Sequence, residues 1–411
     1  MMPTRTPPRE IVYLWPYLEW AGVQIYFSGI MKLAAQRYAI RAAMPEGSDE
    51  KIREYMRRLG VQCDFFPGHM DLSPARSVWH KVRRRLRDAR TAIAIARHVG
   101  RYDLRNTILH VDLGPWWWPL LFCYLSLRAN VFLTLHIALP EQPILRRIRL
   151  QAIFSVLCRM PGFHLLVSNR EMLESIKPYL PESFVPTVRL AYTGIDRAEI
   201  SAVLGRAFDP AHVRERYGLP PDKTFAFSLG RLTARKGCLV LLEAVRRVRE
   251  AAPSLCFVWI GDGDQRAEVE TFLERHALGD AFRVIPPSRI GPDRLDLLEL
   301  LRMADLFIHP SYMEGLPGAV LEAMALGKAC VASRVNAIPE AITDGENGIL
   351  VPPGDAGALA GAILRLFKDP ELRERLGAAG RARVLKTFDE AFAAKTTVDY
   401  YDRCWESGVT G

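Results

Sequence analysis

The feature that most constrains this chain is a regular alternation of short apolar runs with longer amphipathic patterns. Apolar runs that end at turn residues predict buried strands, and the helical patterns between them predict βαβ units with parallel sheets. Two sets of strands separated near residues 195–225 predict an α/β protein made of two Rossmann-like, doubly wound domains that face each other across a cleft. The expected strands cover residues 10–16, 38–45, 107–112, 130–136, 164–169 and 187–193, followed by 224–230, 255–263, 282–287, 306–311, 329–333 and 348–353.

The domain boundary is predicted from the same pattern. We expect an N-terminal domain over residues 1–200 and a second domain over residues 201–388, followed by a helix that begins near residue 389. The segment 196–223 contains a short helical pattern that ends at Gly218 and is followed by a Pro-Pro turn, which is typical of a connection.

Positive charge is concentrated in the first half. Residues 1–195 carry 27 Lys and Arg against 15 Asp and Glu, whereas the later residues are slightly acidic. The basic residues gather in the segments 80–90 and 145–151. This excess indicates an anionic partner, either a membrane surface or a phosphorylated substrate. The alternative is an arginine-rich helix face that only water contacts.

The cysteine pattern and the hydropathy predict the compartment. The seven cysteines are scattered without C-x-x-C spacing, which favours reduced thiols over disulfides or a zinc site. The first residues lack the features of a signal peptide, and the longest apolar run, 113–127, is too short to span a bilayer. We expect a cytoplasmic protein, attached peripherally to the inner face of the membrane if its anionic partner is a membrane. We expect no nucleic acid partner, and the sequence does not indicate an oligomeric state.

The segment HPSYMEGLPGAVLEAMALG (309–327) predicts an anion site. A strand ends near Ser311 and a helix begins near Pro317, so free backbone N–H groups at the helix start suit a diphosphate. Glu314 and Glu322 are better suited to accept hydrogen bonds from sugar hydroxyls. The alternative is an ordinary strand–loop–helix junction, with Glu314 as a cap and Glu322 on the solvent face.

The segment SLGRLTARKG (228–237) supplies positive charge at the end of another strand. Arg231 and Lys236 flank its loop, and two cations there would neutralise a departing diphosphate without a metal. The alternative is a pair of exposed loop cations. An Asp-x-Asp triplet in GDGD (261–264) is of the kind that holds a metal in some enzymes, but an Asp cap and a glycine turn explain it more simply.

Together these segments resemble the retaining GT-B glycosyltransferases of family 4. The similarity lies in EGLPGAVLEAMALG, and it extends to residues 339–355 and 228–245. The resemblance implies a metal-independent hexosyltransferase without a cofactor. It would move a sugar from a UDP- or GDP-linked donor to a saccharide or lipid-linked acceptor, in the synthesis of cell-surface polysaccharide, lipopolysaccharide or glycolipid. It also implies that the helix over 389–411 joins the N-terminal domain.

The resemblance assigns roles to residues of the second half. Arg231 and Lys236 would contact the donor phosphates, Glu314 the transferred sugar, and Glu322 the ribose diol. Backbone contacts are expected from Gly315 and Leu316. The implied catalytic residues are His136, Arg231, Lys236 and Glu314, and the implied donor-binding residues are Gly22, Arg231, Lys236, Ile285, Glu314, Gly315, Leu316 and Glu322.

The first half matches the family more loosely. Gly22 stands where the family commonly has a pair of glycines near the donor phosphates. His136 falls where the family has a histidine that faces the transferred sugar, although a histidine that ends a buried strand also fits a structural role. Asp112 is a candidate for the acceptor's general base, or alternatively a capping residue. Trp116 begins a run of three tryptophans that suits a sugar or lipid platform, with at least one of them in the core.

Two other functions remain open. A sugar-nucleotide 2-epimerase or a hydrolase uses a related two-domain architecture without an acceptor. A catalytically silent relative would bind the nucleotide sugar or scaffold a membrane assembly. The presence of Arg231, Lys236, Glu314 and Glu322 argues against the silent alternative.

Overall fold

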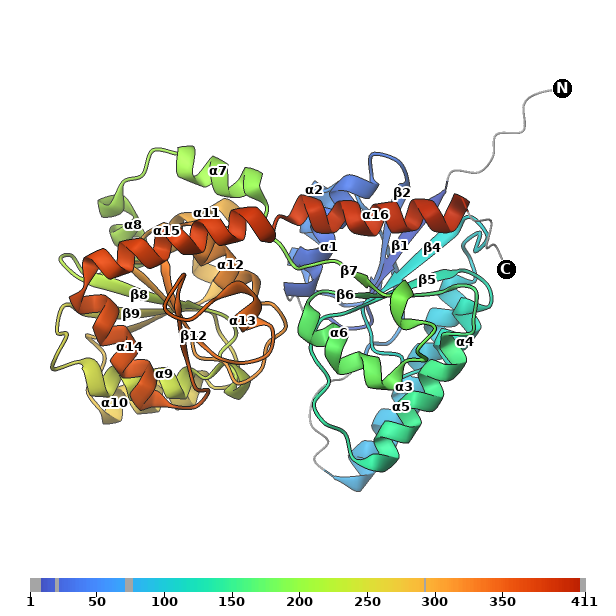
Figure 1. Ribbon diagram of the computed structural model, residues 1–411, viewed down its shortest axis with the longest axis horizontal. Helices are drawn as coiled ribbons and strands as arrows, with labels where there is room; N and C mark the ends of the chain where they lie inside the picture. The colour runs from blue at the N-terminus through green and yellow to red at the C-terminus, as the bar shows by residue number, and fades with distance from the viewer. Residues whose placement is uncertain (1–8, 19–21, 71–76, 292, 407–411) are drawn as a thin grey trace. The chain divides into compact units, whose positions relative to one another are not determined.

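The computed structural model describes residues 9–18, 22–70, 77–291 and 293–406 (Figure 1). The chain divides into two compact units. Unit 1 comprises Met1–Tyr192 with Ala391–Gly411, and unit 2 comprises Thr193–Glu390. Each unit contains one parallel sheet with helices packed on it, so the predicted doubly wound α/β class is confirmed.

Unit 1 contains a seven-stranded sheet in the order β3-β2-β1-β4-β5-β6-β7. The first three strands follow one another from the centre to one edge of the sheet. β4 then lies on the other side of β1, and β5 to β7 follow it toward the opposite edge. The carboxyl ends of β1 and β4 therefore flank the point where the strand order reverses. The strands are β1 (Glu10–Leu14), β2 (Ala39–Pro45), β3 (Gln62–Phe66), β4 (Thr107–Val111), β5 (Asn130–Leu135), β6 (Phe163–Val167) and β7 (Arg189–Leu190).

The helices of unit 1 cover the two faces of this sheet separately. Successive side chains of a strand point to opposite faces, so Val12 and Leu14 pack against α3 to α6, whereas Ile11 and Tyr13 pack against α1, α2 and α16. The helices are α1 (Gly22–Ala34), α2 (Glu50–Arg58), α3 (Val78–Val99), α4 (Pro119–Ser126), α5 (Ile144–Leu157), α6 (Arg170–Ile176) and α16 (Glu390–Glu406), with 3-10 turns η1 (Lys177–Tyr179) and η2 (Val185–Thr187).

The last helix, α16, completes the core of unit 1. Figure 1 shows it in red beside the strands coloured blue and cyan. Tyr401 is fully buried, and its hydroxyl forms hydrogen bonds with Nδ1 of His110 and with the hydroxyl of Tyr13. Val398 and Trp405 of the same helix belong to the same core cluster. Unit 1 is therefore built from both ends of the chain.

Unit 2 contains a six-stranded sheet in the order β10-β9-β8-β11-β12-β13. It reverses direction between β8 and β11, as unit 1 does between β1 and β4. The strands are β8 (Thr224–Leu229), β9 (Leu255–Ile260), β10 (Phe282–Ile285), β11 (Leu306–His309), β12 (Ala329–Ser333) and β13 (Ile349–Val351).

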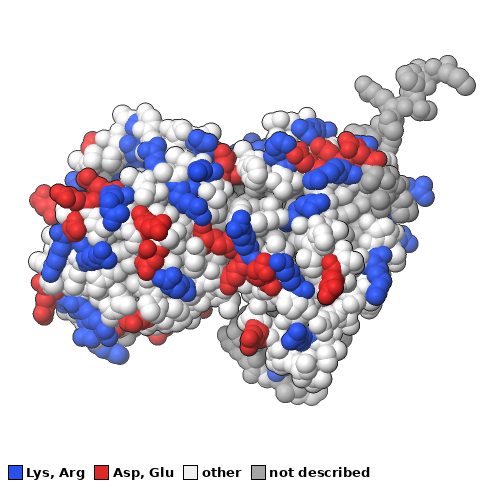
Figure 2. Space-filling model, in the orientation of Figure 1, with Lys and Arg blue, Asp and Glu red and all other residues white. Residues whose placement is uncertain are grey.

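The helices of unit 2 alternate with its strands. One core cluster unites α9 and α14 with the sheet through residues such as Leu242 and Ile363. The α-helices are α7 (Arg197–Gly205), α8 (Pro210–Tyr217), α9 (Cys238–Val248), α10 (Arg266–Arg275), α11 (Arg294–Arg302), α12 (Gly318–Ala325), α13 (Ile338–Ala341), α14 (Ala356–Lys368) and α15 (Pro370–Thr387). The 3-10 turns are η3 (Ala234–Lys236) and η4 (Pro287–Arg289). On the face drawn in Figure 2, acidic and basic side chains of unit 2 are interspersed.

The predicted strands of the second half all form, whereas the first half differs in two places. The strand β3 was not predicted, because QCDFF lies at the sheet edge, is half exposed, and carries no continuous apolar run. The strand expected over residues 187–193 is reduced to the two residues of β7. The short helix predicted before Gly218 is α8, which Gly218 ends with a left-handed φ of 66°.

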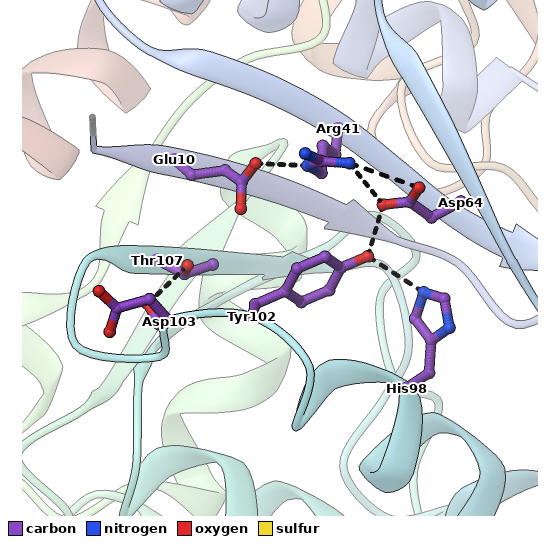
Figure 3. A network of polar contacts seen from close by, with 7 residues as sticks. All are labelled: Glu10, Arg41, Asp64, His98, Tyr102, Asp103 and Thr107. Carbon is purple, nitrogen blue, oxygen red and sulfur yellow. Dashed lines mark hydrogen bonds and ion pairs between the residues drawn. The ribbon is translucent and has the colours of Figure 1, made fainter. Parts of the chain in front are cut away.

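A polar network links β1, β2 and β3 through side chains (Figure 3). Arg41 donates to Glu10 at 2.5 Å and to Asp64 at 3.2 Å. Tyr102 donates to Asp64 at 2.8 Å, and its hydroxyl lies 3.0 Å from Nε2 of His98. The hydrogen bond to Glu10 raises the pKa of Arg41. Since Glu10 begins β1, this network lies toward the amino ends of the strands, away from the edge where ligands bind such sheets.

Two further predictions concern cysteines and membrane spans. All seven cysteines lie within the described residues and are free thiols. In the same part of the chain, no helix has both the length and the apolar character that crossing a membrane requires.

The packing of α16 gives a prediction for Tyr401→Phe. Loss of the hydroxyl leaves His110 without one of its two hydrogen-bond partners in a buried site, so we expect a loss of about 1–3 kcal/mol in the free energy of unfolding. Urea denaturation followed by circular dichroism measures it. Tyr400→Phe is the control, because the Tyr400 hydroxyl makes a long, exposed contact of 3.4 Å with the Thr187 carbonyl. Equal stabilities of both variants would contradict the role given to Tyr401.

Candidate functional site

The strongest candidate site of unit 2 lies where its sheet reverses direction. The strands β8 and β11 are neighbours, and both run parallel, so their carboxyl ends meet at one edge. The loop after β8 contains the segment 230–237, and the loop after β11 contains the segment 310–317. These are the two segments in which the sequence predicts cations and an anion site. The fold therefore brings them together at the position where parallel sheets bind ligands.

The two loops touch each other at Gly237. This residue has a left-handed φ of 70°, and a Cβ added to it would lie 2.0 Å from the carbonyl oxygen of Pro310. The backbone N–H of Tyr312 donates to the Arg235 carbonyl at 2.8 Å nearby. Only glycine allows this backbone conformation and this approach together. Gly237 thus fixes the distance between the loop that carries Lys236 and the loop that carries Glu314.

The carboxylate of Glu314 is the centre of the site. Its Oε1 accepts from the Lys236 ammonium at 2.5 Å and lies 3.0 Å from Nε2 of His309. The backbone N–H of Glu314 donates to the Asn336 side chain at 3.0 Å. The Glu314 side chain is 6% exposed and that of Lys236 is 15% exposed. The carboxylate is therefore buried, but it is paired and hydrogen-bonded.

The surroundings of Glu314 keep it ionised. Burial acts to raise the pKa of Glu314, but the hydrogen bond from His309 and the charge of Lys236 outweigh it and hold this pKa well below its usual range. Burial also lowers the pKa of His309, so the ring is neutral at physiological pH and donates its Nε2 hydrogen to Glu314. The site thus contains a fixed acceptor next to a fixed cation.

Backbone donors lie beside this pair. The helix α12 begins at Gly318, next to the expected position at Pro317, and the first N–H groups of a helix have no partner inside it. Within the described ranges, no hydrogen bond is formed by the N–H groups of Gly315 or Leu316. Helix-start amides close to a lysine make a site suited to a phosphate anion. Arg231, the second predicted cation, is exposed at the start of the loop after β8.

Glu322 lies on α12, but it does not face water as an ordinary junction would require. Its side chain is 7% exposed, and its Oε1 accepts from Arg294 at 2.5 Å. Arg294 also donates to Glu199 at 2.6 Å. Burial acts to lower the pKa of Arg294, but the charges of Glu322 and Glu199 outweigh it and raise this pKa. Arg294 therefore holds Glu322 in one orientation through one of its two carboxylate oxygens.

Three polar residues of this site had no role in the sequence analysis. His309 was recognisable as a polar residue that ends a buried strand five positions before Glu314, but a single histidine there is most simply structural. Asn336 and Arg294 lie 22 and 28 positions from their partners along the chain. No spacing pattern in one sequence indicates such contacts, because they depend on how loops after different strands meet.

The remaining predictions for unit 2 concern Ile285 and the Asp-x-Asp triplet. Ile285 ends β10, its side chain is 1% exposed, and its carbonyl accepts from the Gly261 N–H. Asp262 accepts from the Gly263 N–H at 2.9 Å, as expected of a turn. A Cβ on Gly261 would lie 2.0 Å from the Gly230 carbonyl. In the described parts of the chain, no three His, Cys, Asp or Glu side chains are grouped so that they could hold a metal.

Unit 1 carries the predicted residues His136 and Asp112 at the corresponding edge of its own sheet. They follow β5 and β4, and Oδ1 of Asp112 lies 3.8 Å from Nε2 of His136, which is too far for a hydrogen bond. Both side chains are 13% exposed. Burial lowers the pKa of His136 to about 4 and raises the pKa of Asp112 to about 7. Burial therefore favours the uncharged form of both side chains.

The other predicted residues of unit 1 lie around this edge. Gly22 begins α1, and the neighbouring residues 19–21 lie outside the described residues. Of the three tryptophans, Trp118 is 7% exposed and belongs to the core, as expected of at least one. Trp117 is 40% exposed, and Trp116 packs partly buried against the core.

Known proteins resemble this chain in sequence and in fold. The family described as Glycosyl transferases group 1 matches residues 211–383. Alpha-D-kanosaminyltransferase of Streptomyces kanamyceticus is 34% identical over 188 residues, which cover 46% of this chain and 47% of that protein. Alpha-maltose-1-phosphate synthase of Mycobacterium tuberculosis is 34% identical over 194 residues, with 45% and 49% covered. The aligned part is about half the length of these relatives.

Solved structures agree with the fold over nearly the whole chain. HepE of Anabaena superposes with a TM-score of 0.74 and 17% identity, covering 96% of this chain and all of that one. Sucrose-phosphate synthase of Thermosynechococcus elongatus gives a TM-score of 0.72 and 19% identity, with 97% and 100% covered. At such identities the likeness establishes the fold, and the predicted GT-B architecture is confirmed.

The buried pair of Arg294 and Glu322 gives the next prediction. Arg294→Met leaves the Glu322 carboxylate buried without its partner, so we expect a loss of about 3–5 kcal/mol in the free energy of unfolding. The double variant Arg294→Met/Glu322→Gln should recover part of this loss, and urea denaturation measures all three. Arg246→Met is the control, because its pair with Glu243 is exposed and such surface ion pairs contribute little to stability. A double variant no more stable than Arg294→Met would contradict the coupling.

The raised pKa of Asp112 gives a prediction for the pH dependence of stability. Between its unfolded value of 3.8 and its folded value of about 7, the folded protein binds more protons at this site than the unfolded chain. The contribution of Asp112 to stability therefore falls as pH rises through this window. Asp112→Asn cannot ionise, so we expect its free energy of unfolding relative to wild type to increase by about 2–4 kcal/mol from pH 4 to pH 7. A difference independent of pH, measured in urea, would rule out the raised pKa.

Proposed function

We propose that this chain transfers a sugar from a nucleotide diphosphate sugar to a saccharide or lipid-linked acceptor. The match of residues 211–383 to the family of glycosyl transferases group 1 supports this proposal. The observation that carries the proposal is the contact of Lys236 with Glu314 beside the backbone amides of Gly315 and Leu316. A cation and helix-start amides suit a diphosphate, and a buried, ionised carboxylate suits sugar hydroxyls. Both lie at one edge of one sheet.

The donor is held by groups with separate roles. Lys236, with Arg231, neutralises the phosphates, and the Gly315 and Leu316 amides donate hydrogen bonds to them. The Glu314 carboxylate accepts from hydroxyls of the transferred sugar. Glu322 accepts from the ribose diol with the carboxylate oxygen that Arg294 leaves available. A nucleoside diphosphate, UDP or GDP, meets these requirements, and the crystal structure of HepE is a complex with UDP and glucose.

The chemistry requires charge stabilisation on the leaving group. The bond between the anomeric carbon and the β-phosphate oxygen breaks, and the acceptor hydroxyl oxygen forms the new bond to that carbon while its proton passes to a base. Lys236, Arg231 and the amides stabilise the negative charge on the departing diphosphate, which makes a metal unnecessary. We assign retention of the anomeric configuration on the resemblance to family 4.

Unit 1 contributes groups of a different kind. Asp112, with its pKa raised to about 7 by burial, is suited to accept the proton of an acceptor hydroxyl near neutral pH. His136 is neutral there, because burial lowers its pKa to about 4, and a neutral ring can hydrogen-bond the sugar. We assign Gly22 to the donor phosphates on the resemblance, and Trp116 to the acceptor because an aromatic ring suits a sugar.

The roles of Lys236 and Glu322 predict different kinetic effects. Lys236→Ala should lower the turnover of UDP-glucose or GDP-mannose about 10²–10³-fold and change nucleotide affinity little, because its charge acts mainly on the departing diphosphate. Glu322→Ala should instead weaken UDP or GDP binding. Turnover is followed by nucleotide release with and without an acceptor lipid extract, and binding by calorimetry.

Several controls accompany this experiment. Lys368→Ala, an exposed lysine on α14, should behave as wild type. Excess EDTA should leave the rate unchanged, and an activity that EDTA removes and manganese restores would contradict metal independence. Nucleotide release that does not depend on any acceptor would favour a hydrolase. Undiminished transfer by Lys236→Ala would refute the role given to Lys236.

A further inference from the structure

A pocket of about 470 Å³ lies on unit 1 between α3, α5 and the start of α4. The proposed donor site does not use it. Four arginines from two helices line it, Arg84 and Arg85 from α3, and Arg146 and Arg149 from α5. Among the described lining residues Asp88 is the single carboxylate, and the rest of the wall is formed by Ala89, Leu150 and the three tryptophans 116–118.

The arginines give this pocket the chemistry of a phosphate site. A guanidinium presents a planar fork of donors that matches two phosphate oxygens, and four of them against one carboxylate leave a clear positive excess. Arg149 donates to the Trp116 carbonyl at 3.3 Å, which anchors one guanidinium at the wall. Within the described residues, Arg85 and Arg146 form no ion pair, and both are exposed. Their charges are available to an anion.

Large apolar side chains are exposed on the same helices. On α3, Trp79, Leu86 and Ile93 are 76%, 61% and 52% exposed, and their seven-residue spacing places them along one face. On α5, Leu145 and Ile148 are 79% and 54% exposed. Figure 1 shows both helices running from the sheet toward the same end of unit 1. Exposed apolar groups of this size, next to cations, are typical of a surface that binds a membrane or another protein.

The combination selects one kind of partner. An aqueous phosphate would explain the arginines but not the exposed tryptophan, leucine and isoleucine side chains. A protein partner would explain the apolar groups but does not need four arginines around a hollow. The interface of an anionic bilayer offers phosphates at the level of the arginines and acyl chains below them, where Trp and Leu side chains insert.

We propose that the arginine–tryptophan pocket, together with the apolar residues of α3 and α5, is a membrane-docking face that takes the phosphate headgroup of an anionic phospholipid. Arg85 and Arg146 bind the headgroup, and Trp79, Leu145 and Ile148 enter the interfacial region beside it. This inference concerns unit 1 alone and does not depend on the donor site of unit 2.

The full chain tests the proposal in co-sedimentation with vesicles of phosphatidylcholine, with and without phosphatidylglycerol. We expect binding to the anionic vesicles, little binding to phosphatidylcholine alone, and weaker binding as salt rises. Arg85→Glu/Arg146→Glu should lower the partition coefficient about tenfold or more. Leu145→Gln/Ile148→Gln should lower it as well, because insertion contributes independently of charge.

A matched variant and a second measurement keep the test decisive. Arg375→Glu/Arg381→Glu makes the same change in net charge on α15 of unit 2 and should bind vesicles as wild type. Far-UV circular dichroism and urea denaturation of every variant show that the chain is folded. Equal binding to both kinds of vesicle would overturn the proposal, and so would full binding by Arg85→Glu/Arg146→Glu. Release of the bound protein by glycerol 3-phosphate while the apolar variant binds normally would identify a soluble phosphate ligand and equally overturn it.

Discussion

The buried contact between Lys236 and Glu314 constrains the rest of unit 2. A carboxylate that is 6% exposed costs several kcal/mol unless cations and donors compensate it, and the compensating groups come from different strands. Lys236 follows β8 and Glu314 follows β11. The ion pair between them therefore requires these two strands to be neighbours. The loops must also approach within van der Waals contact, which Gly237 permits. The strand order, the glycine and the ion pair thus depend on one another.

The two units share one sheet topology, but the ionisable groups at the carboxyl edges of their sheets differ in charge state. At the carboxyl edge of the unit 2 sheet, ionised groups are buried in pairs, so their charges are fixed before any ligand arrives. At the corresponding edge of unit 1, burial without close partners shifts the pKa of His136 down and that of Asp112 up. One edge therefore presents permanent charges, suited to a diphosphate. The other presents a neutral histidine and a carboxyl group, Asp112, that exchanges its proton near neutral pH.

Much of this arrangement was predictable from the sequence, for identifiable reasons. Strands buried on both faces appear as continuous apolar runs, so β4, β5, β9 and β12 were found, whereas the half-exposed edge strand β3 was not. Glu314 and Lys236 were found because each lies in a local motif. Arg294 and Asn336 were missed because they belong to other βα units than their partners, Arg294 at the start of α11 and Asn336 after β12, and no local pattern indicates such contacts.

The position of α16 has a consequence for the synthesis of the protein. Unit 1 is interrupted by all of unit 2, and its core contains Tyr401 and Trp405, which are translated only after residues 193–390. Domains fold as units while the chain emerges from the ribosome, in general the N-terminal one first. Here one face of the unit 1 sheet is covered by α1 and α2 but still lacks α16, so its core stays incomplete until the last helix is made. Unit 2, which is continuous in sequence, has no such delay, so it is able to complete its fold on the ribosome first.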